Sequence, residues 1–549
     1  MIEINFVKLY ESSFKDNWNL DALTDINDTN HFTYGEMAKQ IARMHMLFEH
    51  MDINKGDKIA LVGPNHSSWA IVFMATITYG AVIVPILRDF HPSSIENIIL
   101  HSDSKISFID ESIWKNINKH RVTPTVFNLI DFQIIHEVKN KSQNIQAKID
   151  QEFSSKYPKG FNSNDINYPD IKNDSIMCLN YISGSENFLR GVILTGNNYA
   201  GNVLSLRKLN FILKGEKIVV FLPMAHAFGC TLDLLYSLAM GGHLHILSKI
   251  TNAKSLLNAF QQVKPTLIGT VPQILEVIVG REKEQAFLKP FNKIMLKMPL
   301  LKRIVYRRIR KSLVSIFGDN HREMLVGGAT LNGDVEDFLI KIKFPFSVAY
   351  GMTECAPTIS VDKHNLFVPR SCGTIVEDFM KARINSNDPE NIPGEIEVKG
   401  TNVMKGYYKK PIATSLAFTE DGWFKTGDLG VLDKQNRLYI KGLVKTMILG
   451  SNGQNIYQKE IETQLNKMDL VQESLVIMRN NGLIALVYPN YKEIKEKELT
   501  SSDLDKIMKN NRRDLNKMLA RYEKIGKIEL IESEFEKTIE NKIKRELYV

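Results

Sequence analysis

The chain has 549 residues, which is too long for one compact core and indicates about three or four folding units. Apolar residues make up 44% and charged residues 24%, the ordinary composition of a globular protein, so a largely disordered chain is excluded. The formal net charge of +8 is modest for this length. It suits an anionic ligand or a membrane surface as well as it suits nucleic acid.

The cysteines indicate the compartment. They are scattered, with no CxxC pair, so neither a zinc–cysteine site nor a disulfide framework is predicted. Reduced thiols in the cytosol are the simplest interpretation. The first 20 residues mix Asp, Glu and Lys with apolar residues and do not resemble a secretory signal. The four cysteines are Cys178, Cys230, Cys355 and Cys372.

One apolar stretch is long enough to cross a bilayer. Residues 69–87 contain no charged side chain. However, Tyr79-Gly80 interrupts the stretch, and residues 82–85 have the composition of a strand. We therefore expect a buried helix, a glycine stop and a buried parallel strand, with a membrane span as the alternative.

Strands and helices alternate along most of the chain. This order predicts an α/β fold: a large N-terminal domain, residues 1–444, with mainly parallel sheets flanked by helices. The expected strands are 59–62, 81–86, 176–182, 217–222, 266–270, 324–326 and 346–349, and a helix is expected at 67–79.

The last hundred residues have a different pattern. Residues 475–478 and 483–487 flank Asn480-Asn481-Gly482, a turn that suits an antiparallel hairpin. A capped helix is expected from about residue 502 to residue 522. We therefore predict a small, mobile α+β domain at residues 445–549.

Several short segments carry groups suited to a nucleotide. Residues 181–191 form a small-residue turn after a strand, which can point backbone N–H groups at phosphate, although an ordinary surface loop fits equally well. In residues 350–354, an aromatic ring can stack on a base, a hydroxyl can bind phosphate and a carboxylate can hold Mg²⁺. In residues 422–428, Asp428 can bind both hydroxyls of a ribose, or simply favour the turn. Two more segments follow at 452–455 and 537–542.

The order and spacing of these segments resemble the adenylate-forming superfamily of acyl-CoA synthetases, adenylation domains and luciferases. The resemblance spans residues 32–545 and is closest to bacterial long-chain fatty-acid–CoA ligases, on residues 352–357, 452–457 and 534–538. It implies ATP, Mg²⁺ and coenzyme A as cofactors or co-substrates. It also implies a fatty acid as substrate and CoA, or an acyl carrier protein, as acceptor, with no role for nucleic acid.

The resemblance also implies roles for individual residues. Glu354 would hold Mg²⁺, with Thr353 touching phosphate and Lys542 reaching the carboxylate and the α-phosphate during adenylation. Lys445 would mark a hinge, and His226 would line the acyl pocket rather than act as a catalyst. The remaining ATP- or AMP-binding residues would be Ser183, Gly184, Ser185, Arg190, Gly327, Gly328, Ala329, Tyr350, Gly351 and Asp428. Residues 393–396 and 406–408 resemble the strand leading to Asp428.

Several positions depart from the family pattern: Ile182, Glu186, Asn187, Leu189, Arg190, Leu443 and Asn541. Glu186 places a carboxylate in the phosphate loop, and Leu443 stands where the family has arginine, while Arg190 keeps a cation where lysine is usual. Two hypotheses remain: an active acyl-CoA ligase, or a non-catalytic protein that binds nucleotide or acyl groups and kept the fold without turnover.

A basic stretch lies at residues 289–311, where Lys and Arg alternate with Ile, Met and Leu. Such a segment can lie on an anionic bilayer, although a solvated helix face is the simpler interpretation. We therefore expect a cytoplasmic protein, with peripheral contact at the inner membrane face as an open alternative.

Overall fold

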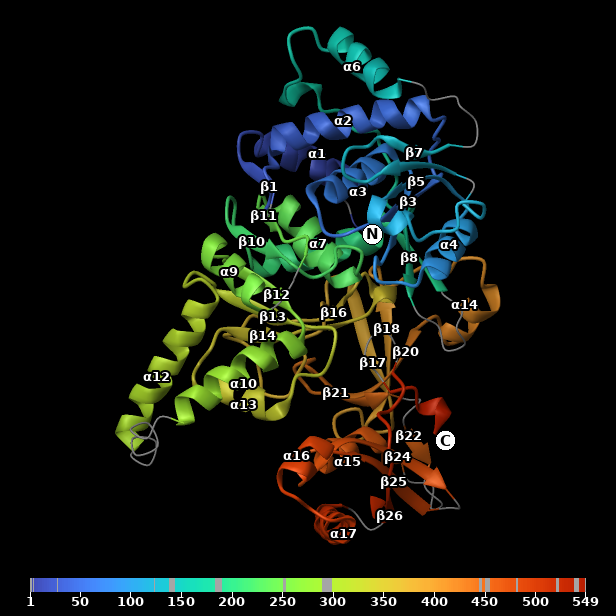
Figure 1. Ribbon diagram of the computed structural model, residues 1–549. Helices are drawn as coiled ribbons and strands as arrows, with labels where there is room; N and C mark the ends of the chain where they lie inside the picture. The colour runs from blue at the N-terminus through green and yellow to red at the C-terminus, as the bar shows by residue number, and fades with distance from the viewer. Residues whose placement is uncertain are drawn as a thin grey trace. The chain divides into compact units, whose positions relative to one another are not determined.

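The computed structural model describes the chain except residues 1, 3, 27, 123, 138–143, 183–189, 250–252, 289–298, 444–446, 450–454, 480–481, 520–522, 538–542 and 549. The chain forms two compact units (Figure 1). The first contains residues 1–382, 398–424 and 435–438, and the second contains 383–397, 425–434 and 439–549. The predicted boundary between residues 444 and 445 lies outside the described residues and stays a prediction.

A seven-stranded sheet forms one half of the first unit. Its order is β14-β13-β12-β10-β11-β1-β2, and every neighbouring pair is parallel except β1 with β2. The strands are β1 (Asp21–Asp25), β2 (His31–Thr33), β10 (Lys217–Val220), β11 (His243–Ile246), β12 (Leu267–Thr270), β13 (Glu323–Val326) and β14 (Phe346–Val348).

An eight-stranded sheet of order β19-β9-β8-β4-β3-β5-β6-β7 forms the other half. Its central strands β8, β4, β3, β5 and β6 are parallel, and antiparallel strands complete both edges. The predicted α/β class with mainly parallel sheets is therefore confirmed. The strands are β3 (Lys58–Val62), β4 (Val82–Ile86), β5 (Ser104–Ile109), β6 (Thr125–Asn128), β7 (Ile134–His136), β8 (Ile176–Ile182), β9 (Arg190–Thr195) and β19 (Gly406–Tyr407).

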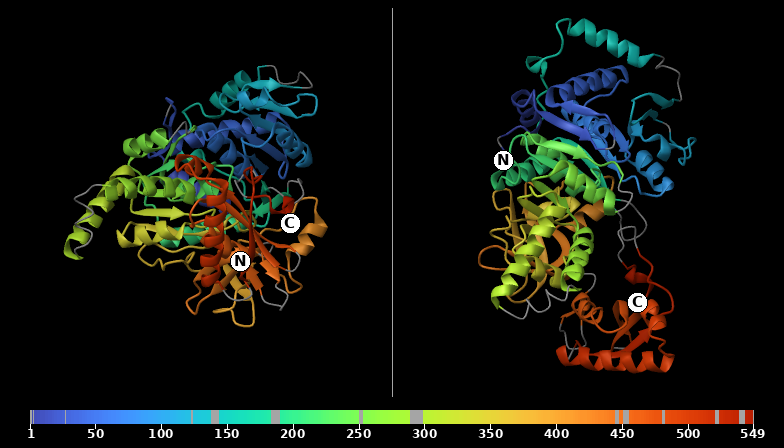
Figure 2. Two further views of the ribbon diagram at one scale, coloured as in Figure 1. Left: turned by 60° about the horizontal axis from the view of Figure 1, so that its bottom comes forward. Right: turned by 60° about the vertical axis from the view of Figure 1, so that its left-hand side comes forward.

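Helices surround these two sheets, and α6 lies on the outer side of α2 (Figures 1 and 2). The longer ones are α1 (Phe6–Asp16), α2 (Tyr34–His50), α3 (Ser67–Tyr79), α4 (Pro92–His101), α6 (Ile145–Lys156), α7 (Gly196–Leu209), α9 (Ala253–Val263), α10 (Pro272–Leu288), α12 (Pro299–Ile316) and α13 (Gly333–Lys341). Shorter helical segments are α5 (Glu111–Trp114), η1 (Ser163–Asp165), the π-helix η2 (Gly229–Tyr236), α8 (Ser237–Ala239), η3 (Thr353–Cys355) and α14 (Pro411–Ala417). Two short strands, β15 (Tyr350–Gly351) and β16 (Thr358–Ser360), pair separately.

The apolar stretch at residues 69–87 is a core element. Helix α3 ends at Gly80, whose φ of 94° is left-handed, and β4 follows with every residue buried. The expectation of a buried helix, glycine stop and parallel strand is confirmed. None of the described helices is long and apolar enough to span a bilayer.

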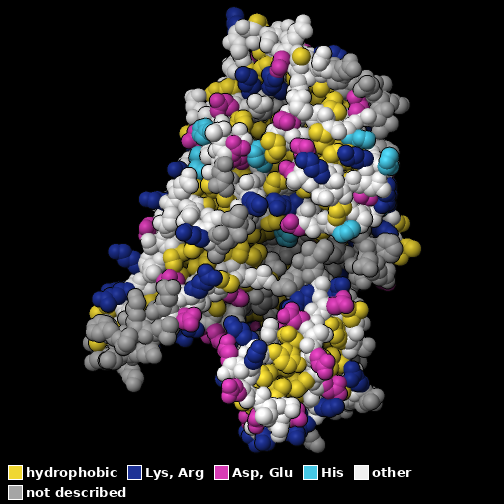
Figure 3. Space-filling view, viewed as in Figure 1, with side chains coloured by type: hydrophobic (Ala, Val, Ile, Leu, Met, Phe, Trp, Pro, Cys, Tyr) yellow, Lys and Arg dark blue, Asp and Glu magenta, His cyan; other side chains and the backbone are white. Residues whose placement is uncertain are grey.

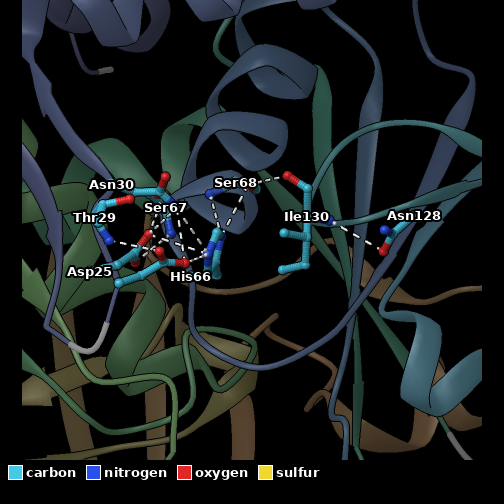
Figure 4. A network of polar contacts seen from close by, with 9 residues as sticks. Asp25, Thr29, Asn30, His66, Ser67, Ser68, Asn128 and Ile130 are labelled. Atoms are coloured by element: carbon cyan, nitrogen blue, oxygen red, sulfur yellow. Dashed lines mark hydrogen bonds and ion pairs between the residues drawn. The ribbon is translucent and has the colours of Figure 1, made fainter.

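A polar network fixes the start of α3 (Figure 4). The carboxylate of Asp25 accepts hydrogen bonds from the Ser67 hydroxyl at 2.6 Å and the Ser67 amide at 3.0 Å, and it lies 3.3 Å from His66 Nε2. His66 Nδ1 accepts from the Ser68 amide at 3.1 Å, while the buried Ser68 hydroxyl donates to the Ile130 carbonyl. This Asp–His–Ser set therefore caps a helix, because its hydroxyls are committed to protein acceptors.

The second unit contains an α+β substructure of the predicted kind. Strands β24 (Val471–Arg479) and β25 (Gly482–Pro489) form the expected antiparallel hairpin, and β26 (Ile525–Leu530) adds to it in parallel. Helices α15 (Gln458–Leu465) and α17 (Ser501–Met518) pack on one face of this sheet (Figure 2). Helix α17 begins at a Thr500–Asp503 capping box and ends four residues earlier than predicted, because Leu519 is extended. Further elements are β17 (Met380–Asn385), β18 (Gly394–Gly400), β20 (Phe424–Leu432), β21 (Leu438–Leu443), β22 (Met447–Leu449), β23 (Asn455–Tyr457), α16 (Tyr491–Glu496) and η6 (Arg545–Leu547).

Candidate active site

Two of the predicted nucleotide-binding segments follow neighbouring strands of the seven-stranded sheet. The turn 327–329 follows β13, and Tyr350-Gly351 follows β14. The strands are parallel, and the Ala349 amide donates a hydrogen bond to the Val326 carbonyl at 2.8 Å. Both segments therefore lie at the carboxyl edge of the sheet, where ligands of open α/β folds bind.

Two glycines in these segments are required by the backbone. Gly328 has a φ of +85°, a left-handed conformation that side chains disfavour. A Cβ at Gly351 would lie 2.1 Å from the Pro357 carbonyl oxygen, which is too close for any other residue. Gly328 lets the chain turn after β13, and Gly351 lets the segment after Tyr350 pass close to the backbone of Pro357.

Glu354 is buried on the short helix η3, and its carboxylate has a specific partner. The Tyr407 hydroxyl donates to Glu354 Oε1 at 2.9 Å, and the Met404 amide donates to the Glu354 carbonyl at 2.7 Å. The carboxylate and the neighbouring Thr353 hydroxyl are hard oxygen donors of the kind that Mg²⁺ prefers. The residues present therefore fit the predicted metal site.

Tyr407 also connects Glu354 to Arg190. The Arg190 guanidinium lies 5.3 Å from the centre of the Tyr407 ring, within range of a cation–π contact. Burial, followed by the adjacent Glu354 charge, raises the pKa of Tyr407 far above its usual value, although Arg190 opposes the shift. The hydroxyl therefore stays protonated and acts as a donor. Arg190 and Glu354, predicted to bind phosphate and metal, thus contact the same ring.

The sequence interpretation missed this role of Tyr407. It assigned residues 406–408 to the strand that leads to Asp428, whereas β19 pairs with β9, next to the predicted phosphate loop. That assignment is wrong because strand pairing depends on contacts that are distant in sequence. The Gly406-Tyr407 motif was the sequence signal that could have marked Tyr407 as a site residue.

Two buried polar residues hold the turn that carries Glu354. Asn202 on α7 is fully buried, donates to the Cys355 carbonyl at 2.9 Å and accepts from the Thr358 amide at 2.8 Å. The Thr231 hydroxyl on η2 donates to the Ala356 carbonyl at 2.9 Å. These contacts satisfy buried backbone groups of an irregular turn. No sequence pattern marked either residue.

His226 lies in an exposed turn just before η2. Its Nδ1 accepts a hydrogen bond from the Phe228 amide at 3.3 Å. The ring therefore stabilises the turn. Its role in an acyl pocket stays a prediction.

The π-helix η2 contains an unusual acid, Asp233. Its side chain is buried, and its Oδ2 has no hydrogen-bond partner among the described residues. Burial raises the pKa of this carboxyl well above its usual value. We infer that the folded protein holds Asp233 as a neutral acid at moderate pH.

A pH-dependent stability follows from Asp233. Because the folded pKa exceeds the unfolded value of about 4, its stabilising contribution is complete below that pH and is lost as the pH rises toward the folded pKa, by up to about 1.4 kcal/mol per pH unit. We expect Asp233→Asn to raise the melting temperature relative to the unmodified protein more at pH 8 than at pH 5. Thermal unfolding at both pH values measures this, with exposed Asp89→Asn as the control. An equal difference at both pH values contradicts the inference.

Asp428 lies on β20 in the second unit. Its amide donates to the Thr426 hydroxyl at 3.1 Å, and the preceding Gly427, with a φ of +75°, donates to Glu395 Oε1 at 3.1 Å. Glu395 thus supports the backbone before Asp428 from β18, a different strand from the one that carries Asp428. The ribose role of Asp428 stays a prediction.

Several predicted site residues lie outside the described residues: Ser183, Gly184, Ser185, Lys445 and Lys542. The strands on either side of the first three are described. β8 and β9 pair antiparallel as far as Ile182 and Arg190, so residues 183–189 connect adjacent strands. The predicted phosphate loop follows a strand, as expected.

Comparison with known proteins identifies the class. The pattern of the family described as "AMP-binding enzyme" matches residues 11–408, so the chain belongs to the AMP-binding enzyme family. Among solved structures, the ATP-bound MatB of Rhodopseudomonas palustris covers 99% of this chain and 98% of its own at 21% identity, with a TM-score of 0.74. The fold is therefore that of adenylate-forming enzymes.

Curated relatives differ in the acid that they activate. Long-chain-fatty-acid–CoA ligase 1 of Saccharomyces cerevisiae is 26% identical over 490 residues, covering 80% of this chain and 69% of its own length. A feruloyl-CoA synthase of an Amycolatopsis species is also 26% identical, over 453 residues, covering 81% of this chain and 80% of its own length. At these identities, the names alone do not select one acyl group.

Proposed function

We propose that this protein activates a fatty acid with ATP and transfers the acyl group to CoA. The observation that carries the proposal is the contact of Arg190 and Glu354 with one tyrosine, Tyr407, in a chain of the AMP-binding enzyme family. It places a cation and a carboxylate suited to Mg²⁺ together, as an ATP phosphate group requires.

The reaction has two halves. A carboxylate oxygen of the fatty acid attacks the α-phosphorus of ATP, the bond to the β-phosphate oxygen breaks, and pyrophosphate leaves. The CoA thiol then loses its proton and attacks the acyl carbonyl carbon, and AMP leaves. The protein contributes mainly by positioning groups and neutralising charge.

Individual residues serve the first half. Glu354 would hold Mg²⁺, which would neutralise phosphate charge, and Thr353 would touch a phosphate oxygen. Arg190 faces a phosphate, with Tyr407 fixing both Arg190 and Glu354. The turn 327–329 and Tyr350 contact adenine. Asp428 binds the ribose, and Lys542 reaches the reacting carboxylate. Lys445 is the hinge about which the small domain turns between the two halves.

ATP–pyrophosphate exchange tests the proposal and the acyl group together. We expect exchange with palmitate to exceed exchange with ferulate, malonate or a short fatty acid at equal concentration. Product analysis with CoA and with an acyl carrier protein then identifies the acceptor. Exchange with ferulate but not with palmitate would assign the chain to another acyl-CoA ligase type.

The alternative is a non-catalytic protein that keeps the fold, because Glu186 and Leu443 both act against ATP binding. A carboxylate about 4 Å from a phosphate charge costs about 4 kcal/mol at an effective dielectric near 20. We expect Glu186→Thr combined with Leu443→Arg to raise kcat/KM for ATP by roughly two orders of magnitude.

Steady-state kinetics at saturating fatty acid and CoA check this expectation. If the unmodified enzyme is already fast and the double variant is no faster, the phosphate loop binds ATP well despite Glu186, and the expectation of impaired ATP binding is wrong. Binding of ATP without turnover in both proteins supports the non-catalytic alternative.

Residues 289–298 of the basic stretch lie outside the described residues, and the rest of the stretch lies on α12. On α12, the buried residues Val305, Ile309 and Leu313 pack in the core cluster with α9 and α10, so its apolar face is not available to a bilayer. The cations Lys302, Arg303, Arg307, Arg308, Arg310 and Lys311 are exposed, and Figure 3 shows Lys and Arg side chains in this region. Any membrane contact by this helix is therefore electrostatic.

Charge reversal tests that contact. Each surface cation near an anionic bilayer contributes about 1 kcal/mol. We expect Arg307→Glu, Arg308→Glu and Arg310→Glu together to reduce sedimentation with anionic vesicles, and high salt to reduce it in the unmodified protein. Unchanged sedimentation leaves α12 as a solvated helix.

A further inference from the structure

Two histidines and an aspartate meet at the edge of the seven-stranded sheet, on three adjacent strands. Asp21 begins β1, His31 begins β2 and His243 begins β11. Asp21 Oδ1 lies 3.0 Å from His31 Nε2, and Asp21 Oδ2 lies 3.8 Å from His243 Nδ1. One such ligand atom from each of the three residues lies within 4.8 Å of the other two.

These separations suit a metal ion. Zn²⁺ binds imidazole nitrogen and carboxylate oxygen at about 2.0–2.2 Å, so ligand atoms of a tetrahedral site lie roughly 3.3–3.6 Å from one another. The observed distances of 3.0 and 3.8 Å, one to each oxygen of the Asp21 carboxylate, lie on either side of that range. Small rotations of the half-exposed Asp21 and His31 side chains are sufficient to complete the geometry.

His243 is oriented as a metal ligand by its neighbour. Thr24 Oγ1 lies 2.8 Å from His243 Nε2 and is placed to accept that ring's proton, which leaves the Nδ1 lone pair facing Asp21. Metal-binding histidines usually donate their second ring N–H to such a partner, which fixes the tautomer.

The competing explanation for these contacts is an ordinary ion pair between Asp21 and His31. The presence of a third potential ligand, His243, distinguishes the cluster from such a pair. The side chains of His50 and Glu152, whose Nε2 and Oε2 atoms lie 2.9 Å apart, form a similar His–carboxylate pair and are also partly exposed. Within the described part of the chain, only the Asp21 cluster brings together three groups that are suited to a metal ion. One charge opposes a cation: Lys217 is the direct neighbour of His243 on β10. Its exposed side chain can extend into solvent.

We propose that Asp21, His31 and His243 bind one divalent transition-metal ion, with Zn²⁺ the best fit. Two imidazoles and one carboxylate are ligands that zinc and its neighbours accept and that Mg²⁺ disfavours. The ion ties the edge strand β2 to β1 and β11. In Figure 3, histidine and acidic side chains gather on the surface near β1 and β11, so water can occupy a fourth position.

Titration of the full-length protein with Zn²⁺, without ATP, tests the proposal. We expect one high-affinity ion per chain, unaffected by millimolar Mg²⁺, and a rise in melting temperature because the ion binds the folded state. His31→Ala and Asp21→Asn, both at exposed positions, should weaken this binding at least tenfold. Thr24→Val, which removes only the support of His243, should weaken it by about 10- to 100-fold.

Cobalt provides a spectroscopic readout independent of enzymatic activity. Bound Co²⁺ should give the visible absorption of a tetrahedral site, and His31→Cys should add a thiolate-to-cobalt charge-transfer band. His50→Ala is the matched control, since it removes a histidine from a His–carboxylate pair elsewhere on the surface. It should leave both signals unchanged.

The same measurements define failure. Zn²⁺ binding that is equally strong in His31→Ala, Asp21→Asn and the unmodified protein overturns the proposal, because other histidines then hold the ion. Absence of stoichiometric binding also overturns it. Neither outcome would contradict the proposed ligase activity, which is measured separately with Mg²⁺ and ATP.

Discussion

Replacing Glu354 with Gln is expected to lower ATP–pyrophosphate exchange by about two to three orders of magnitude while the protein keeps its fold. The amide has the same shape as the carboxylate, and its oxygen can still accept the 2.9 Å hydrogen bond from Tyr407. The negative charge that binds Mg²⁺ is lost, and removing a preorganised electrostatic group from an active site typically has an effect of this size.

A matched control separates the metal role from the loss of a buried charge. Glu336 is also buried, and its carboxylate accepts a hydrogen bond from the Arg370 amide at 2.6 Å and pairs with the Arg370 guanidinium at 3.2 Å. Glu336→Gln should therefore perturb stability without reducing exchange to the same extent. Excess Mg²⁺ should partly restore exchange in Glu354→Gln. Near-normal exchange in Glu354→Gln would remove Glu354 from the metal site.

Replacing Lys542 with Ala is expected to separate the two half-reactions. The role of Lys542 rests on resemblance, which places it on the mobile small domain next to the reacting carboxylate and α-phosphate. Its loss removes a positive charge from the adenylation transition state, so formation of acyl-adenylate from fatty acid and ATP should fall by at least about 100-fold. Thioester formation from supplied acyl-adenylate and CoA should continue, because the small domain has then turned away.

Lys544→Ala is the control for Lys542, since it removes a nearby cation whose partner is Glu536 at 3.4 Å. It should leave both half-reactions intact. Equal loss of both half-reactions in Lys542→Ala would contradict a role confined to adenylation and would indicate general damage to the small domain.

The sequence by itself determined the local elements and the fold class. Helix α3 and strand β8 have the predicted bounds, and Gly80 ends α3 where expected. Such features are fixed by short-range causes: apolar periodicity, capping side chains and the freedom of glycine to adopt positive φ. The α/β class follows from their alternation. The segments at residues 350–354 and 327–329 could be singled out because each is contiguous, the first from its side chains and the second from the family resemblance.

Tertiary structure decided which distant segments meet. Only the pairing of β19 with β9 brings Tyr407 between Arg190 and Glu354. Asn202 looks like any polar helical residue until its contacts with residues 355 and 358 are seen. Likewise, the sequence of α12 is compatible with membrane binding, and only the structure shows that its apolar face packs in the core.

The cluster of Asp21, His31 and His243 shows most clearly that sequence alone does not predict which distant residues meet. Its members are separated by up to 222 residues and carry no motif spacing. Their side chains come together because β1 pairs with both β2 and β11, and this register is set by burial of the whole sheet rather than by any local preference. Local sequence therefore determined the elements of this protein, and long-range packing decided which side chains share a site.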